Sequence, residues 1–205
     1  FNLNPKDKEV EKELGFENKV VIGYIGSFVN YEGLDLLLEA CAILKENHGD
    51  VFKLLLVGDG AMMQMLRRTT RFLQLEDHVV FTGRVPHDEV QKYYSLIDIA
   101  PLPRKGLRVC ELVSPLKPFE AMGSGKVLIT SSVRALAEIV DDGVTGLVFE
   151  KDNVEDLAAK LELAITNEEL RNEIGTNANK WITENHSWDI ISERVAKVYD
   201  EILEE

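Results

Sequence analysis

The sequence has no apolar run that approaches the ~20 residues needed to cross a bilayer, so no transmembrane segment is expected. It has only two cysteines, Cys41 and Cys110, which show neither CxxC nor metal-type spacing. Such thiols are typically reduced and belong to a cytoplasmic protein, and Cys41 is expected in the core face of a helix. The chain also lacks an initiator Met and a signal-peptide apolar core, which favours a fragment of a longer protein.

Metal-binding patterns are absent as well. None of the four histidines (His48, His78, His87 and His186) has another histidine or a cysteine three or four residues away, and all four are expected at the surface or at helix ends. There is no DxD cluster, so we expect no metal and no other cofactor. The net charge of −13 argues against nonspecific binding to nucleic acid or to an anionic membrane.

What the sequence does contain is a regular alternation of apolar runs and helical patterns. Runs typical of strands buried on both faces are VVIGYIG, FKLLLVGDG, HVVFTG, residues 97–101, residues 127–130 and TGLVFE. Between them lie amphipathic segments such as LDLLLEACAILKE and MMQMLRRTTRFLQL, and helices over 87–96, from Pro118 and near Ala135. This order predicts an α/β fold: a single doubly wound, Rossmann-like domain with about six parallel strands.

The end of the chain is predicted to be helical. Asn153 is placed to cap a helix over VEDLAAKLELAI, and two more helices should start near Asn167 and Ser187. Trp181 and Trp188 are expected to anchor these last helices.

The stretch PLPRKGLRVCELVSPLKPFEAMGSGKVLITS has the features of an anion site. Arg104, Arg108 and Lys117 supply positive charge in an acidic protein, and Ser114-Pro115 is a candidate helix N-terminus with unpaired N–H groups. Glu120, one turn further on, is suited to accept hydrogen bonds from vicinal hydroxyls. A ligand with phosphate and ribose, such as a nucleotide sugar, would use both features.

Three glycine-bearing turns should lie near this stretch. They are Gly26-Ser27, Gly58-Asp59-Gly60 and Gly83-Arg84, and each follows an apolar run. Ligands of doubly wound sheets bind beyond the carboxyl ends of the strands. The turns and the basic cluster are therefore predicted to face one crevice.

Seven segments in this order resemble a known family: GYIGSFVNYEGLDLLLEA, LLLVGDG, VVFTGRVPHDEV, YYSLIDIAPLP, PLKPFEAMGSGKVLITS, AEIVDDGVTGLVFEKDNVEDLA and SWDIISERVAKVYDEIL. The chain resembles the C-terminal domain of retaining glycosyltransferases of the two-Rossmann-domain type, family four. That resemblance implies a donor-binding domain for a UDP or GDP sugar, and an N-terminal domain, absent from this chain, that holds the acceptor.

The resemblance also implies a domain layout. Residues 1–18, from Phe1 onward, look like an inter-domain linker; residues 19–185 would form the nucleotide-sugar-binding domain. Residues 186–205 would be a helix that crosses toward the absent domain. The whole protein would be cytoplasmic, with peripheral attachment to the inner membrane through that domain, and such enzymes often build surface polysaccharides.

Site residues follow from the resemblance one at a time. Glu120 matches the glutamate that binds the ribose hydroxyls of the donor. The other matching residues would contact three parts of the donor. Gly83, Arg84 and Val85 would lie along the nucleobase, and Gly58, Asp59 and Gly60 would line the donor pocket. The diphosphate would be contacted by Gly26, Ser27 and the backbone of Val113, Ser114, Pro115 and Leu116.

The chain departs from the family pattern at three positions. Leu112 stands where the motif usually has a second glutamate, and Ser27 and Glu32 stand where the first loop usually has Arg and Lys. Our hypothesis is that Lys117, Arg104 and Arg108 replace the missing cations, with Lys117 and Arg104 stabilising the leaving diphosphate. The resemblance implies that the anomeric configuration is retained and that no metal is needed.

Two other functions remain open. A noncatalytic nucleotide-sugar-binding or scaffold domain is favoured by Leu112 and by the absent partner domain. A dinucleotide-dependent oxidoreductase shares the fold, but GSFVNYEG after the first strand lacks the G-x-G-x-x-G spacing. The base, the sugar and the acceptor are not determined by the sequence.

Overall fold

The computed structural model describes residues 5–204 and contains a parallel sheet of six strands. The strand order is β3-β2-β1-β4-β5-β6. The strands are β1 (Val20–Ile25), β2 (Phe52–Val57), β3 (Val79–Gly83), β4 (Ile99–Leu102), β5 (Val127–Ser131) and β6 (Leu147–Phe149). This is the doubly wound Rossmann-like arrangement predicted from the alternation of apolar runs and helical patterns.

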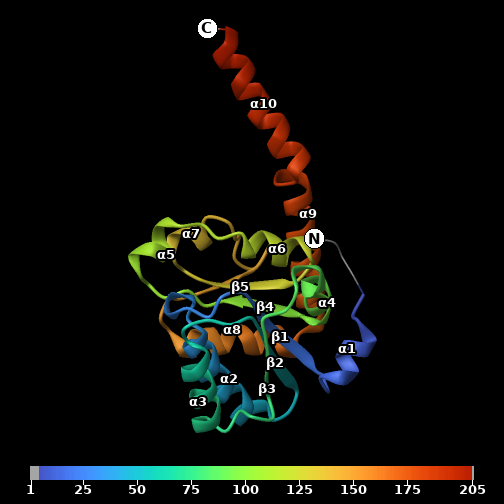
Figure 1. Ribbon diagram of the computed structural model, residues 1–205, viewed down its shortest axis with the longest axis vertical. Helices are drawn as coiled ribbons and strands as arrows, with labels where there is room; N and C mark the ends of the chain where they lie inside the picture. The colour runs from blue at the N-terminus through green and yellow to red at the C-terminus, as the bar shows by residue number, and fades with distance from the viewer. Residues whose placement is uncertain (1–4, 205) are drawn as a thin grey trace.

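Helices cover both faces of the sheet (Figure 1). One group is α2, α3 and α8, which pack together; the other includes α4, α6 and α9, with α6 packed on α9. The helices are α1 (Lys8–Glu13), α2 (Leu34–His48), α3 (Met63–Phe72), α4 (Val90–Leu96), α5 (Arg108–Leu112), α6 (Lys117–Gly123), α7 (Arg134–Ala137), α8 (Val154–Thr166), α9 (Glu168–Asn185) and α10 (Trp188–Glu204), with short 3₁₀ turns η1 (Asn30–Glu32) and η2 (His87–Glu89).

The core explains why these segments fold as they do. All five residues of β5 are buried, as are five of the six in β2, because helices lie on both sides of these strands. In α2 the buried residues include Leu37, Leu38, Cys41 and Leu44, at helical spacing, so the core position predicted for Cys41 is confirmed.

The strand order reverses at β1. The chain runs outward from β1 through β2 to β3, then returns to β4 on the other side of β1. The loops that follow β1 and β4 therefore leave the sheet side by side and in opposite directions. In folds of this kind that divergence opens the ligand-binding crevice.

The loop between β4 and β5 differs from the sequence expectation. It contains α5, which was not foreseen, and Ser114 and Pro115 lie in the connection after α5 rather than at a helix start. The next helix, α6, begins at Lys117 with Pro118 in its first turn. A residue before proline avoids the α conformation, which keeps Ser114 out of a helix.

The two ends of the described chain behave differently. In the segment expected to be a linker, α1 is joined to the domain, since Lys6 Nζ lies 2.8 Å from Asp98 Oδ2 and Asp7 N donates to Ser95 Oγ. Residues 1–4 of that segment, including Phe1, lie outside the described residues. At the other end, α10 rises away from the domain, on the side where α5, α6 and α7 lie (Figure 1). Within residues 5–204, no helix has both the length and the apolarity to cross a membrane.

Two expectations about single residues were wrong. His78 is buried rather than exposed, with its ring 5.2 Å from that of Phe52, because it leads directly into β3. Trp188 is 84% exposed and does not anchor α10 to the domain; Trp181 is partly buried and does pack against the core.

Candidate functional site

Glu120 lies on α6, close to the point where the strand order reverses. The hydroxyl of Tyr94, from α4, donates to Glu120 Oε2 at 3.1 Å. Burial raises the pKa of Tyr94, and the negative charge of Glu120 raises it further, so the phenol stays protonated and able to donate. One carboxylate oxygen of Glu120 is thus held by the protein.

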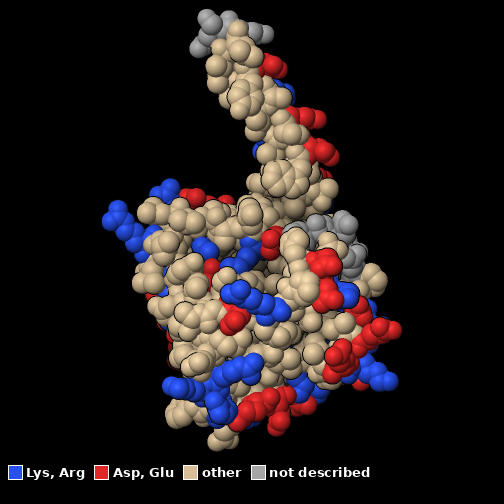
Figure 2. All heavy atoms as spheres, viewed as in Figure 1, with Lys and Arg blue, Asp and Glu red and all other residues tan. Residues whose placement is uncertain are grey.

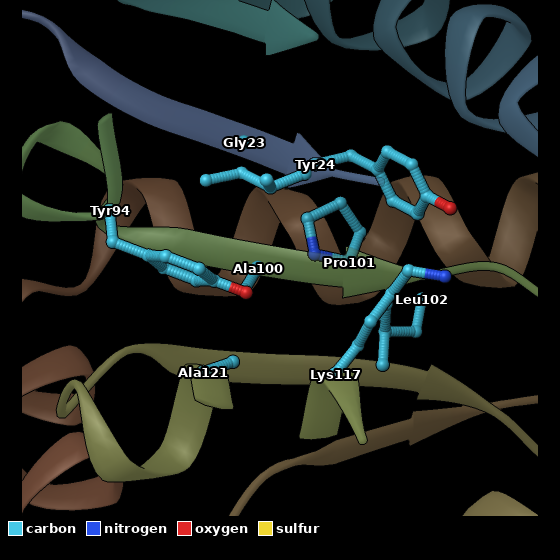
Figure 3. A pocket seen from close by; sticks show the side chains of 9 residues that line it. Gly23, Tyr24, Tyr94, Ala100, Pro101, Leu102, Lys117 and Ala121 are labelled. Atoms are coloured by element: carbon cyan, nitrogen blue, oxygen red, sulfur yellow. The ribbon is translucent and has the colours of Figure 1, made fainter. Parts of the chain in front are cut away.

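A small cavity lies beside this pair. It has a volume of about 10 Å³ and is lined by residues of β1, β4, α4 and α6. Figure 3 shows Tyr94 reaching toward Ala100 and Ala121, while Tyr24 and Lys117 extend together toward the carboxyl end of β4. The cavity therefore marks the start of the crevice between β1 and β4.

Lys117 lies over the turn that follows β1. Its Nζ is 5.2 Å from the centre of the Tyr24 ring and 2.9 Å from Glu32 Oε1. A Cβ atom at Gly26 would lie only 2.5 Å from Lys117 Cε, so the glycine leaves room for the lysine. The side chain of Lys117 is 21% exposed, so it is the more accessible member of its pair with Glu32, which is 3% exposed.

Arg104 is placed differently from the expectation that it contacts the ligand. Its side chain is only 7% exposed; Nη2 donates to Glu32 Oε1 at 3.0 Å and Nη1 donates to the Val113 carbonyl at 2.9 Å. Arg104 is therefore an internal anchor between η1 and the end of α5.

Glu32 is the centre of this charge cluster, and the sequence analysis did not assign it that role. Its side chain is 3% exposed, and both Arg104 and Lys117 bond its Oε1. Burial opposes ionisation, but the hydrogen bonds and charges of Arg104 and Lys117 outweigh it and lower the pKa of Glu32. The signal available in the sequence was the unusual acidic residue itself, directly before Gly33.

The glycine turns pack backbone against backbone. Gly26 N donates to Val57 O at 3.0 Å and Gly58 N donates to Gly83 O at 2.9 Å, which joins the ends of β1, β2 and β3. A Cβ at Gly58 would lie 1.9 Å from Gly26 O, and one at Gly60 would lie 2.4 Å from Phe28 O. The three turns thus share one edge of the sheet, as predicted.

Asp59, Arg84 and Val85 complete this edge. Asp59 Oδ1 accepts a hydrogen bond from Gly60 N at 2.7 Å, and its Oδ2 lies 3.9 Å from Arg84 Nε. The Arg84 side chain is 83% exposed, whereas Val85 is partly buried against the core. Arg84 therefore lies on the solvent side of this edge, next to Asp59, whereas the side chain of Val85 packs inward.

The segment around α5 exposes several apolar side chains. Leu112 is 68% exposed, Val113 52% and Leu116 74%, and Arg108 and Ser114 are exposed as well. Figure 2 shows charged side chains of both signs near a hollow of this face, below the base of the projecting helix.

Glu111 does not take the place of the glutamate that the family motif has at Leu112. Its Oε2 accepts from Arg134 N at 2.8 Å and its Oε1 bonds Lys151 Nζ at 2.5 Å, so it ties α5 to α7. Among residues 5–204, no three His, Cys, Asp or Glu side chains are grouped so that they could hold a metal ion.

Comparison with known sequences places the chain in a family. The family described as "Glycosyl transferases group 1" matches residues 5–181. The chain belongs to this family. An uncharacterized glycosyltransferase of Methanocaldococcus jannaschii is 31% identical over 179 residues, which cover 87% of this chain and 47% of the relative.

Another relative has a specific name. The alpha-D-kanosaminyltransferase of Streptomyces kanamyceticus is 23% identical over 198 residues, which cover 95% of this chain and 49% of the relative. The chain spans about half the length of the curated relatives it matches.

Solved structures share the fold. The C-terminal domain of a group 1 glycosyl transferase from Francisella tularensis superposes with a TM-score of 0.75 at 19% identity, covering 91% of this chain and 97% of that chain. HepE from Anabaena, in complex with UDP-glucose, superposes with a TM-score of 0.84 at 20% identity, covering 98% of this chain and 56% of that chain. The fold is thus that of a C-terminal domain of a group 1 glycosyltransferase, as the sequence resemblance implied.

Proposed function

We propose that this chain is the donor-binding domain of a retaining glycosyltransferase, which moves a sugar from a nucleoside diphosphate sugar to an acceptor. The observation that carries the proposal is the placement of Glu120 and Lys117 on α6, about one turn apart, with Lys117 above the Gly26 turn. A carboxylate suited to ribose hydroxyls and a cation suited to phosphate then face the same crevice.

The proposed chemistry relies on charge stabilisation. As the bond to the leaving diphosphate breaks, negative charge builds on the phosphate oxygens and the anomeric carbon becomes oxocarbenium-like. Lys117 and the backbone amide of Ser27 are assigned to this negative charge, and each well-placed donor contributes about 2.7 to 4 kcal/mol. The acceptor attacks from the face that the diphosphate leaves, so the configuration is retained without a protein nucleophile, a metal or another cofactor.

The proposal extends to partners. An N-terminal domain would hold the acceptor, and α10 would cross toward that domain. UDP or GDP would be the nucleotide; HepE, which shares the fold, was solved with UDP-glucose.

A relative from Staphylococcus aureus, 27% identical over 207 residues, is named a capsular polysaccharide biosynthesis glycosyltransferase, which supports a polysaccharide acceptor. We place the whole protein in the cytoplasm, peripheral to the membrane through the N-terminal domain.

A noncatalytic nucleotide-sugar-binding domain is the second candidate. The exposed Leu112, at the position of a glutamate in the usual motif, favours it. Transfer of sugar by the longer protein, measured with radiolabelled donor, distinguishes the two functions. The oxidoreductase alternative is not favoured, because the loop from Gly26 to Gly33 lacks the dinucleotide-binding glycine pattern.

The donor-binding role is tested by calorimetric titration of this chain with UDP, GDP, ADP and NAD. We expect one nucleoside diphosphate to bind, and Glu120→Gln to weaken it about 10- to 100-fold through loss of charged hydrogen bonds. Glu162→Gln is the control, because Glu162 is also a helical glutamate with a side-chain partner, His48, but lies on α8. Binding of NAD alone would favour the oxidoreductase, and equal affinity in Glu120→Gln would remove Glu120 from the site.

A further inference from the structure

Two buried polar atoms in the charge cluster have no hydrogen-bond partner: Glu32 Oε2 and Arg104 Nε. They belong to residues that are already joined, since Arg104 Nη2 donates to Glu32 Oε1. The Nε and Nη2 donors of a guanidinium group lie side by side and match the two oxygens of a carboxylate. Arg104 and Glu32 could therefore form two parallel hydrogen bonds, an arrangement called the fork below, and only one of the two bonds is made.

Lys117 explains why the fork is incomplete. Its Nζ bonds the same oxygen, Oε1, at 2.9 Å, so one carboxylate oxygen serves two cations while the other serves none. The hydroxyl of Tyr24 donates to Ser27 O at 3.2 Å and lies close to Glu32, since burial and then the Glu32 carboxylate raise the pKa of Tyr24. Because Oε1 is shared, Oε2 does not complete the bond to Arg104 Nε.

The three side chains differ in how free they are to move. Glu32 and Arg104 are 3% and 7% exposed, and Arg104 is held further by the Val113 carbonyl. Lys117 is 21% exposed and lies over Gly26, at the edge of the crevice. Two cations share one carboxylate, so the cluster has an excess of positive charge, and Lys117 is the member that an incoming anion can reach.

We propose that Glu32 is a positioning residue that exchanges partners when an anionic ligand binds. In the free chain it holds Lys117 over the Gly26 turn. When phosphate oxygens take Lys117, the Glu32 carboxylate closes on Arg104, and the bond from Arg104 Nε to Glu32 Oε2 forms. That bond satisfies both unpaired atoms and offsets the loss of the lysine from Glu32. The identity of the anion as the donor's diphosphate rests on the proposed function; the exchange itself does not.

The exchange gives Arg104 a role other than ligand contact. Arg104 keeps Glu32 charged and in place after Lys117 has left, so the buried carboxylate is never without a counter-ion. The exchange also explains why an acidic residue is tolerated in a phosphate-binding loop. Glu32 positions Lys117 in the free chain, and once the anion is bound its negative charge is neutralised by Arg104.

The first test needs no ligand. In Lys117→Met, Oε1 is no longer shared, so the fork should close in the free chain. We expect the NMR signal of Arg104 Nε–H, assigned with Arg104→Lys, to shift downfield and its hydrogen exchange to slow at least about tenfold. Lys53→Met is the control, since Lys53 is also a partly buried lysine bonded to a carboxylate, Asp50, but lies at the opposite end of the sheet. An unchanged Arg104 signal in Lys117→Met would overturn the exchange.

The second test adds inorganic pyrophosphate to the wild-type chain. We expect saturation to produce the same Arg104 Nε–H signal as Lys117→Met, and Lys117→Met to bind pyrophosphate at least about tenfold more weakly, with Lys53→Met within about twofold. Adding Glu32→Gln to Lys117→Met should abolish the shifted signal, because an amide cannot complete the fork. Pyrophosphate binding without any change at Arg104 would refute the exchange while leaving the donor site intact. Failure of UDP, GDP and pyrophosphate alike to bind would instead refute the proposed function, and the ligand-free test would still decide the exchange.

Discussion

Gly33 shows how a single residue sets the geometry of the site. Its φ of +73° lies in the left-handed region, and a Cβ there would lie 1.8 Å from Pro103 O. It follows Glu32 directly and precedes α2. The close approach of the two backbones brings the β1 loop and the β4 loop together, which is where Glu32 meets Arg104.

We therefore expect Gly33→Ala to destabilise the chain by about 3 kcal/mol or more, the combined effect of an unfavourable φ and a backbone displacement. Urea unfolding followed by circular dichroism measures it. Gly143→Ala is the control: Gly143 also has a positive φ, of +79°, but nothing lies within 4 Å of an added Cβ. Gly143→Ala should lower the free energy of unfolding by about 1–2 kcal/mol. Equal losses at the two positions would show that the contact with Pro103 is unimportant.

Lys126 gives a prediction about pH. Burial lowers the pKa of Lys126 to about 8 from its ordinary 10.5; Asp98 opposes this change and Lys6 adds to it. Below pH 8 the lysine is charged in both the folded and the unfolded chain. Between pH 8 and 10.5 the folded chain loses the proton while the unfolded chain keeps it, so this residue makes stability rise with pH.

Titration of Lys126 should raise the free energy of unfolding by about 2 kcal/mol between pH 7.5 and pH 9.5, because one unit of pKa shift corresponds to about 1.36 kcal/mol. It is measured as the difference between wild type and Lys126→Met in urea unfolding at the two pH values. Taking the difference removes the opposing effect of Cys41, whose pKa is raised by burial in the fold. A difference that stays constant between the two pH values would mean that Lys126 titrates normally.

At the scale of elements, helices with a capping residue were predicted well. Asn153 Oδ1 accepts from Asp156 N at 2.9 Å, and Asn167 Oδ1 accepts from Leu170 N at 3.0 Å, at the starts of α8 and α9.

We expect Asn153→Ala to lower the free energy of unfolding by about 1 kcal/mol, since it leaves a helix-terminal N–H without its partner. Thermal unfolding checks it, with the exposed, mid-helix Glu173→Ala as a neutral reference. A loss no larger than that of the reference would contradict the capping role.

The strands and the three glycine turns were also predictable, because apolar runs and glycines are local signals. Helix α5 was not, since its five residues are too few to show a period. The pairing of Arg104 with Glu32 was out of reach for another reason: the two residues are 72 positions apart and meet only through the order of the strands. The sequence therefore indicated the cations of the site but not the carboxylate that holds them.

On the scale of the whole molecule, α10 stands apart. It projects from the domain (Figure 1), and in Figure 2 its visible surface is mostly uncharged, with acidic side chains along one edge. Trp188, Val195, Tyr199 and Ile202 are 84%, 48%, 64% and 63% exposed and share one stripe at helical spacing. An exposed stripe of this kind marks an interaction surface. In the proposed whole protein it faces the N-terminal domain.

Removal of residues 188–205 should therefore leave the domain itself intact. We expect the shortened chain to unfold within about 2 °C of the full chain, because α10 leaves most of its large apolar side chains in solvent and adds little to the core. A drop of about 5 °C or more would mean that α10 folds back onto the domain in solution.

A charge placed on the stripe tests the contact with the N-terminal domain. Ile202→Glu should lower the unfolding temperature of the longer protein while leaving that of this chain unchanged. Since a charge on the stripe is harmless in water and costly in an interface, a drop in both proteins would point to a role for α10 within the domain, and a drop in neither would remove the stripe from the interface.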